Sequence, residues 1–77
     1  MAATVDARGL ACPLPLALAK RRMEGLAAGE MLVVLATDPE APIDLAAWAD
    51  GEGHALAVRE REGWSEFELV KRGGAIR

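Results

Sequence analysis

The sequence predicts an α/β two-layer sandwich with the element order βαβαββ, a four-stranded mixed sheet and two helices on one face. Three observations predict this class. Residues 31–36 form a continuous apolar run, a helical segment separates this run from a short strand candidate near the N-terminus, and two alternating segments lie near the C-terminus. A strand, a helix and a second strand indicate a parallel βαβ unit with a right-handed crossover. The alternating pair indicates a hairpin, which makes the sheet mixed.

The first helix is expected from Pro13 to about Ala28, after a short strand over Thr4–Arg8 that carries Val5 and Ala7 on one face. Its alanine, leucine, lysine, arginine and methionine residues favour a helix. Gly29 is a stop signal. An apolar stripe at helical spacing is expected to face the sheet. It consists of Leu16, Ala19, Met23 and Leu26.

The apolar run over residues 31–36 is expected to be the central strand, buried on both faces, because it is continuous and rich in β-branched residues. Thr37-Asp38-Pro39 then begins a second helix, since a capping residue followed by proline is typical of a helix start. The residues expected to form its core face and its end are Leu45, Trp48, Ala49, Gly51 and Gly53.

Two strands are expected over His54–Arg61 and Trp64–Lys71, joined near Glu62-Gly63. Their alternation predicts one apolar face and one solvated face. We expect residues 1–77 to form a single domain. The tail Arg72–Arg77 is expected to fray, with about 73–77 flexible. The apolar faces of the two strands consist of Leu56, Val58, Phe67 and Leu69.

Composition limits the function classes. The 77 residues suffice for one small domain, and the net charge of −3 argues against a general nucleic-acid binder. No secretory signal or membrane-length apolar segment is present, so neither export nor membrane insertion is expected. One cysteine and one histidine make a metal site unexpected, and no cofactor is expected. One cysteine cannot form an internal disulfide, which fits a reducing compartment such as the cytoplasm.

The only cysteine, Cys12, directly precedes a proline at the predicted start of the first helix. We expect Cys12 to be the N-cap residue and Pro13 the first helical residue, where a missing N–H has no cost. Because Pro13 and Pro15 have no N–H, Leu14 and Leu16 are expected to carry the unpaired amides near the sulfur. A helix N-terminus favours negative charge, so it lowers the pKa of a thiol and yields a nucleophilic thiolate. The alternative is a small buried side chain without chemistry.

The pattern Asp6-x-x-Gly9-x-x-Cys12-Pro13-x-Pro15 resembles the signature of the TusA/SirA family of small sulfur carriers. The resemblance implies a persulfide relay. Cys12 would accept a sulfane sulfur from a donor protein, such as a cysteine desulfurase or a rhodanese, and pass it to an acceptor protein. Family roles include tRNA thiolation and sulfur oxidation. The resemblance extends over Gly29-Glu30, Thr37-Asp38-Pro39, Asp44 and Lys71-Arg72-Gly73-Gly74.

The resemblance also implies roles for the residues around the catalytic Cys12. Pro13, Leu14 and Pro15 would shape the helix start, and Asp6 and Gly9 would shape the preceding loop. Well-known members have arginine before the Cys-Pro pair and glutamate between the prolines, where this chain has Ala11 and Leu14. Losing the cation weakens stabilisation of the thiolate, and losing the anion partly offsets this effect.

Other polar residues admit two interpretations. Lys20, Arg21 and Arg22 form either an ordinary solvated face or a docking surface for an acidic partner. Asp38 is expected to cap the second helix and to lie near Cys12, because both follow strand ends at one edge of the sheet. His54 is expected to be structural or exposed, since no spacing ties it to Cys12.

Two alternative functions stay open. Gly73-Gly74 is similar to the end of ubiquitin-like carriers that use a terminal thiocarboxylate, but those domains have the order ββαββ, and three residues follow the glycines here. The other alternative is a non-catalytic regulatory or interaction module of the same fold. We expect the protein to be a monomer in isolation.

Overall fold

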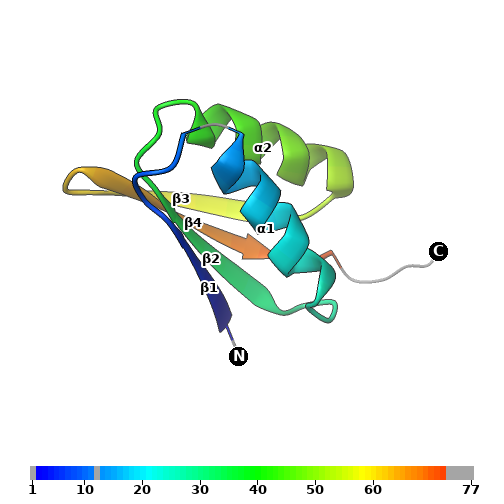
Figure 1. The fold of residues 1–77 in the computed structure, drawn as a ribbon. Helices are drawn as coiled ribbons and strands as arrows, with labels where there is room; N and C mark the ends of the chain where they lie inside the picture. The colour runs from blue at the N-terminus through cyan, green and yellow to red at the C-terminus, as the bar shows by residue number, and fades with distance from the viewer. Residues whose placement is uncertain (1, 12, 73–77) are drawn as a thin grey trace.

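The computed structural model describes residues 2–11 and 13–72, and its four strands form one sheet with the order β1-β2-β4-β3. Both helices cover the same face of this sheet (Figure 1). The predicted two-layer sandwich is therefore confirmed. The elements are β1 (Ala2–Ala7), α1 (Leu14–Glu24), β2 (Met31–Ala36), α2 (Ala41–Glu52), β3 (Ala55–Arg61) and β4 (Trp64–Val70). None of the helices in the described part of the chain is long and apolar enough to cross a membrane.

The register of the sheet follows from the βαβ unit and the hairpin. β1 and β2 are parallel, with Ala2 opposite Met31 and Ala7 opposite Ala36. β4 lies between β2 and β3 and is antiparallel to both. Because the crossover through α1 returns β2 alongside β1, the connections that follow these two strands meet at one end of the sheet.

The hydrophobic core lies between the sheet and the helices. Side chains on the helix-facing side of β2 and β4 are fully buried, and α1 and α2 contribute the opposite wall. Burying a leucine or phenylalanine contributes about 1.5–3 kcal/mol to folding, so these few residues supply much of the stability. The largest members are Leu32, Val34, Leu45, Phe67 and Leu69.

The expectation that β2 is buried on both faces is wrong. Leu32, Val34 and Ala36 are buried against the helices, whereas Met31, Val33 and Leu35 on the other face are only half-buried. The reason is architectural: both helices lie on one side, so no layer covers the other side of the central strand.

Both helices have ends that differ from the prediction. α1 ends at Glu24, not Ala28, because the Gly25 amide turns back to the Arg22 carbonyl at 3.1 Å and tightens the last turn. α2 runs through Gly51 to Glu52 and ends at Gly53, whose φ of 80° is the left-handed conformation that suits glycine.

The end of β4 is tied to the end of α1. The Lys71 ammonium donates to the carbonyls of Met23 at 3.0 Å and Leu26 at 2.6 Å, and its backbone exchanges hydrogen bonds with the 29–30 turn. Arg72 donates its N–H to His54 Nδ1 at 2.9 Å. The expectation that fraying begins at Arg72 is therefore wrong, and the tail expected to be flexible, residues 73–77, lies outside the described residues.

Candidate functional site

The predicted nucleophile, Cys12, lies outside the described residues, but the chain on both sides of it is described. Ala11 and Pro13 are both exposed. The Leu14 N–H donates to the Ala11 carbonyl at 2.9 Å, and this bond holds the approach to α1 in place. Both neighbours of Cys12 in the sequence therefore lie at the surface, immediately before the first turn of a helix.

The helix begins one residue later than predicted. Pro13 is the N-cap residue, and its carbonyl accepts the first helical hydrogen bond, from Ala17 at 2.9 Å. Pro15 occupies the first turn and is buried. The expectation of Cys12 at the N-cap with Pro13 as the first helical residue is wrong by one position. The physical reason is that Pro13 has φ −98° and ψ 17°, outside helical geometry, so regular geometry begins at Leu14.

Pro13 and Pro15 reduce the number of backbone N–H donors at this helix start. Among residues 13–16 only Leu14 and Leu16 have an N–H, and the Leu14 amide is engaged by Ala11. Of the two amides expected to be unpaired, Leu14 is therefore already occupied. The first turn therefore offers an anion fewer direct N–H donors than the sequence predicts, and the helix dipole favours negative charge at the same end.

Asp6 lies near the end of β1, and its carboxylate binds Arg8 in the turn that leads toward Cys12. Its carboxylate accepts the Arg8 guanidinium at 2.9 Å on each oxygen and the Arg8 backbone N–H at 3.2 Å. The Arg8 side-chain hydrogen bonds lower the pKa of Asp6 from 3.8 to about 2. Arg8 also lies over the Trp64 ring, 5.1 Å from its centroid. Asp6 is thus an ionised structural anchor, which is unsuited to act as a base near neutral pH.

Gly9 joins this loop to the end of β2. Its N–H donates to Thr37 Oγ1 at 2.9 Å. Its φ is 84°, in the left-handed region, and a Cβ built there would meet no atom within 4 Å. The position therefore favours glycine for its backbone conformation and not for lack of space. The sequence does not predict this contact with Thr37.

Asp38 lies next to Thr37, on the same loop. Its Oδ1 accepts the Glu40 N–H at 2.8 Å, and its carbonyl accepts the Ala41 N–H at 3.0 Å. The N-cap of α2 is Glu40. The expectation that Asp38 itself caps the helix is wrong, because its side chain instead closes a turn two residues earlier. Through the Gly9–Thr37 bond, the Asp38 loop adjoins the loop that leads to Cys12.

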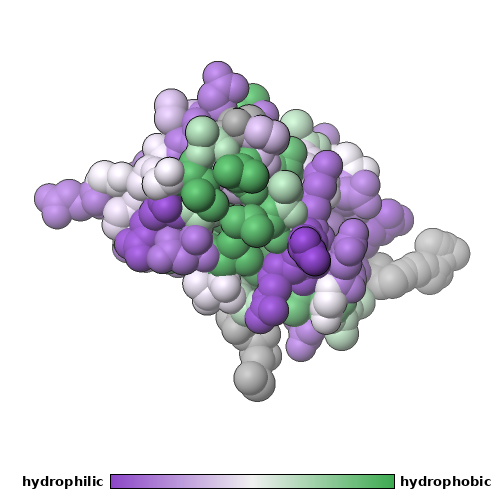
Figure 2. Space-filling model, in the orientation of Figure 1, coloured by the Kyte–Doolittle hydropathy of each residue, from purple (hydrophilic) through white to green (hydrophobic). Residues whose placement is uncertain are grey.

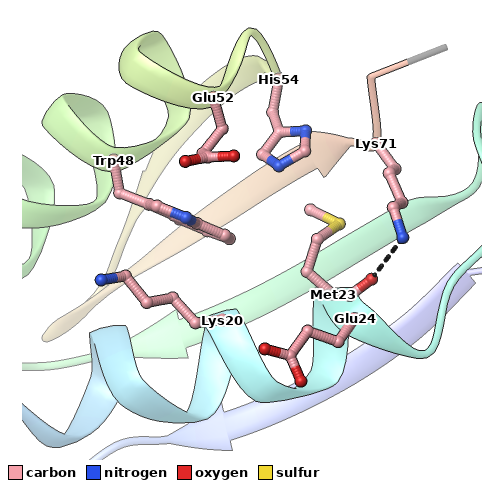
Figure 3. Close-up of a pocket in the computed structure, with 7 residues that line it drawn as sticks. All are labelled: Lys20, Met23, Glu24, Trp48, Glu52, His54 and Lys71. Atoms are coloured by element: carbon pink, nitrogen blue, oxygen red, sulfur yellow. Dashed lines mark hydrogen bonds between the residues drawn. The ribbon is translucent and has the colours of Figure 1, made fainter. Parts of the chain in front are cut away.

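The basic cluster is split between two faces of α1. Lys20 lines a groove between the two helices, with a volume of about 350 Å³ (Figure 3). Arg21 and Arg22 line a different groove, on the side of α1 that faces β1. The three consecutive cations therefore do not form one surface. The inter-helix groove is lined by Lys20, Met23, Glu24, Trp48, Glu52, His54 and Lys71.

His54 belongs to this inter-helix groove, at the end of α1 remote from position 12. Its ring meets Trp48 edge-on with centroids 5.3 Å apart, and its Nδ1 accepts the Arg72 N–H. Burial lowers the pKa of His54 below 6.5. The accepting Nδ1 places the proton of the neutral ring on Nε2. These contacts give His54 a structural role at the far end of the helix.

Large apolar side chains are exposed beside the Cys-Pro motif. Leu14 is 51% exposed and Leu18 is 38% exposed, one turn further along α1. Figure 2 shows a hydrophobic area in the middle of the face that carries the helices, bordered by hydrophilic residues. The apolar stripe predicted for α1 faces the sheet. Leu14 and Leu18 form a second apolar stripe on α1, which is exposed to solvent.

Comparison with known proteins identifies close relatives of the chain. The family model described as "Sulfurtransferase TusA" matches residues 3–71. The chain is 38% identical to the sulfur carrier protein TusA of Allochromatium vinosum, covering 88% of this chain and 90% of the relative. It is 45% identical to YrkF of Bacillus subtilis over 96% of this chain, but it spans only 41% of the length of YrkF.

A solved structure shares the fold. The crystal structure of a SirA-like protein from Desulfitobacterium hafniense matches with a TM-score of 0.84 and 31% sequence identity. The match covers 94% of this chain and 99% of the other chain. The shared architecture therefore includes both helices and all four strands.

Proposed function

Because the chain belongs to the TusA family of sulfurtransferases, we propose that it is a sulfur carrier that holds sulfane sulfur as a persulfide on Cys12. The observation that carries the proposal is the position of the only cysteine. It follows Ala11 and precedes Pro13, both exposed, at the start of α1. A nucleophile at such a place can be reached by another protein, and the helix terminus favours its anionic form.

The proposed reaction is a pair of sulfur transfers. The Cys12 thiolate attacks the outer sulfur of a donor persulfide. A new S–S bond forms on Cys12 while the S–S bond of the donor breaks, and the donor cysteine leaves as a thiolate. An acceptor thiolate then attacks the outer sulfur on Cys12 and regenerates the Cys12 thiolate. The chain has no second cysteine that could resolve the persulfide internally, so the sulfur waits for an acceptor.

The neighbouring residues would position this chemistry. Pro13 and Pro15 start the helix, and Leu14 offers an exposed apolar contact for a partner. Asp6 and Gly9 hold the preceding loop. Asp38 would support the same corner from its own turn, through its neighbour Thr37.

We infer that the partners are proteins, namely a donor such as a cysteine desulfurase or a rhodanese and an acceptor with its own cysteine. Arg21 and Arg22 would attract an acidic partner surface, and such complementarity mainly raises the association rate. Lys20 is left out of this surface because it lines the groove between the helices. A cytoplasmic location is part of the proposal, because a thiol carrier works best where disulfides are rare.

Mass spectrometry after incubation with a persulfide donor tests the proposal. The wild-type chain should gain one sulfur atom that dithiothreitol removes, and the Cys12→Ser variant should gain none. Equal gain in both proteins, or no gain in the wild type, overturns it. A chain that stays folded but whose Cys12 resists alkylation at every pH would instead be the non-catalytic module.

A further inference from the structure

A groove runs between α1 and the first strand of the sheet, separate from the groove between the helices. It has a volume of about 330 Å³. Val5 and Leu18 supply its apolar part, and Arg21 and Arg22 supply two guanidinium groups. Gly25 also lines it. We call these five residues the β1–α1 groove.

The helical residues of the groove lie on the same side of α1 as Leu14, near the start of the helix. Leu18, Arg21, Arg22 and Gly25 recur at helical spacing on one side of α1, and the exposed Leu14 lies one turn before Leu18. A rise of 1.5 Å per residue makes this stripe about 16 Å long. Five residues of extended chain span about the same length, at roughly 3.3 Å each. One end of such a segment would lie beside the motif that contains Cys12.

The strand that borders the groove has an unpaired edge. β1 is the first strand in the order β1-β2-β4-β3, and among residues 2–11 and 13–72 it pairs with β2 alone (Figure 1). The opposite edge strand, β3, ends in the charged run Arg59-Glu60-Arg61, which discourages strand pairing. In β1 the charge lies at Asp6, near the end of the strand, and the stretch Ala3–Val5 contains no charge and no proline. Its outer N–H and C=O groups are thus a template for another strand.

The two arginines of the groove have no carboxylate partner within the described residues. By contrast, Arg8, Arg59 and Arg61 each form an ion pair at 2.9–3.2 Å. The whole chain carries a net charge of −3, so two neighbouring unpaired cations stand out against its general charge. A ligand that covers the groove would therefore gain most from carboxylates opposite Arg21 and Arg22.

We propose that an extended, acidic segment of a partner protein adds to the free edge of β1 as a fifth strand. Its apolar side chain would lie on Val5 and Leu18, and its carboxylates would pair with Arg21 and Arg22. Strand addition provides affinity through backbone hydrogen bonds and specificity through alternate side chains. The use of this segment to deliver sulfur rests on the proposed function, but the binding itself requires no sulfur chemistry.

The test uses the peptide Val-Thr-Glu-Thr-Glu, blocked at both ends, together with its reversed sequence. Either is titrated into reduced wild-type protein at 150 mM salt, where charges beyond about 8 Å are screened. Backbone amide shifts are followed by NMR without a sulfur donor. Shifts should concentrate in Ala3–Ala7 and along the groove side of α1. Replacing both glutamates of the peptide by lysine should abolish them.

Matched variants separate the groove from general charge. Arg21→Glu or Arg22→Glu should weaken binding about tenfold, as expected for loss of a charge-assisted hydrogen bond. Lys20→Glu makes the same charge change on the other face of α1 and should leave binding within about twofold. If Lys20→Glu weakens binding as much as the arginine variants do, the groove is not the site.

Methylation of the peptide nitrogens tests strand addition directly, with the protein unchanged. Consecutive residues of a strand direct their N–H groups to opposite edges, so the two threonine N–H groups share one edge and the two glutamate N–H groups share the other. Methylating the two threonine nitrogens and methylating the two glutamate nitrogens should therefore have unequal effects, with one set abolishing binding. Equal effects overturn strand addition.

Self-association of the edge is checked without peptide. Concentration-dependent NMR shifts of Ala3–Ala7 in the protein alone would assign the edge to a second copy of the chain and would also overturn the proposal.

These outcomes are independent of the sulfur-transfer test. A chain that accepts sulfur on Cys12 but ignores the peptide keeps the proposed function and loses the docking inference. A chain that binds the peptide but never accepts sulfur does the reverse.

Discussion

The backbone N–H of Gly9 donates a hydrogen bond to the Thr37 hydroxyl at 2.9 Å, across 28 positions of sequence. The bond joins the loop that leads from β1 to Cys12 with the loop that leads from β2 to α2. The candidate site is therefore positioned by the connection from β2 to α2 as well as by α1.

Replacing Thr37 by valine should release the loop that precedes Cys12. The variant keeps the side-chain shape but removes the acceptor of the Gly9 amide. Loss of one such bond should lower the free energy of unfolding by about 1 kcal/mol. Urea denaturation measures this loss, and hydrogen exchange at the Gly9 amide should accelerate. Thr4→Val, at an exposed position on β1, is the control. Unchanged exchange at Gly9 contradicts the assignment.

Two glycine-to-alanine variants should change stability in opposite directions. Gly9 has φ 84°, so Gly9→Ala should destabilise the fold by about 1 kcal/mol through backbone strain. Gly51 lies inside α2, and a Cβ there meets no atom within 4 Å. Gly51→Ala should stabilise the fold by about 0.5–1 kcal/mol, because alanine favours helix. Denaturant midpoints measure both, and a shift of the same sign in the two variants refutes this explanation.

Lys71→Met should loosen the carboxyl end of α1. The half-buried ammonium donates to the carbonyls of Met23 and Leu26, where positive charge also complements the helix dipole. Its removal should cost about 1–2 kcal/mol of unfolding free energy. Lys20→Met removes an exposed lysine from the same inter-helix groove and should cost far less. Equal losses in the two variants would show that the Lys71 hydrogen bonds contribute little.

Stability should fall as the pH drops through the titration of His54. Burial lowers the pKa of His54 in the folded protein below the ordinary 6.5. The unfolded chain therefore takes up a proton first, and the stabilisation, which is complete above pH 6.5, is lost as the pH falls toward the pKa of the folded state. His54 is the only histidine, so its ring resonances report the pKa without ambiguity. The variant His54→Gln should show less of this pH dependence, and a folded-state pKa above 6.5 would reverse the expected sign.

The fold was predictable because its signals are local. The apolar run of β2 and the alternation of β3 and β4 each mark a strand within six or seven residues. The end of α1 differs from the prediction because Gly25, and not Gly29, stops the helix. The exposed outer face of β2 could not be predicted from its composition, since burial there depends on which side the helices occupy.

The candidate site was only partly predictable. Successive helix residues are turned by 100° from one another, so Lys20 points to another side of α1 than Arg21 and Arg22 do. This separation is predictable from helical geometry alone. The Gly9–Thr37 bond and the anchoring of α1 by Lys71 link positions 28 and 45–48 residues apart. No local pattern reports such contacts, because they arise from the way the crossovers bring distant loops together.

A practical rule for protein engineering follows from the contact between Lys71 and the end of α1. A truncation before Lys71 would disturb a helix whose own residues are all present, because the atoms that cover its last carbonyls come from another part of the chain. Affinity tags, dyes and fusion partners on the carboxyl side should therefore be attached beyond Arg72.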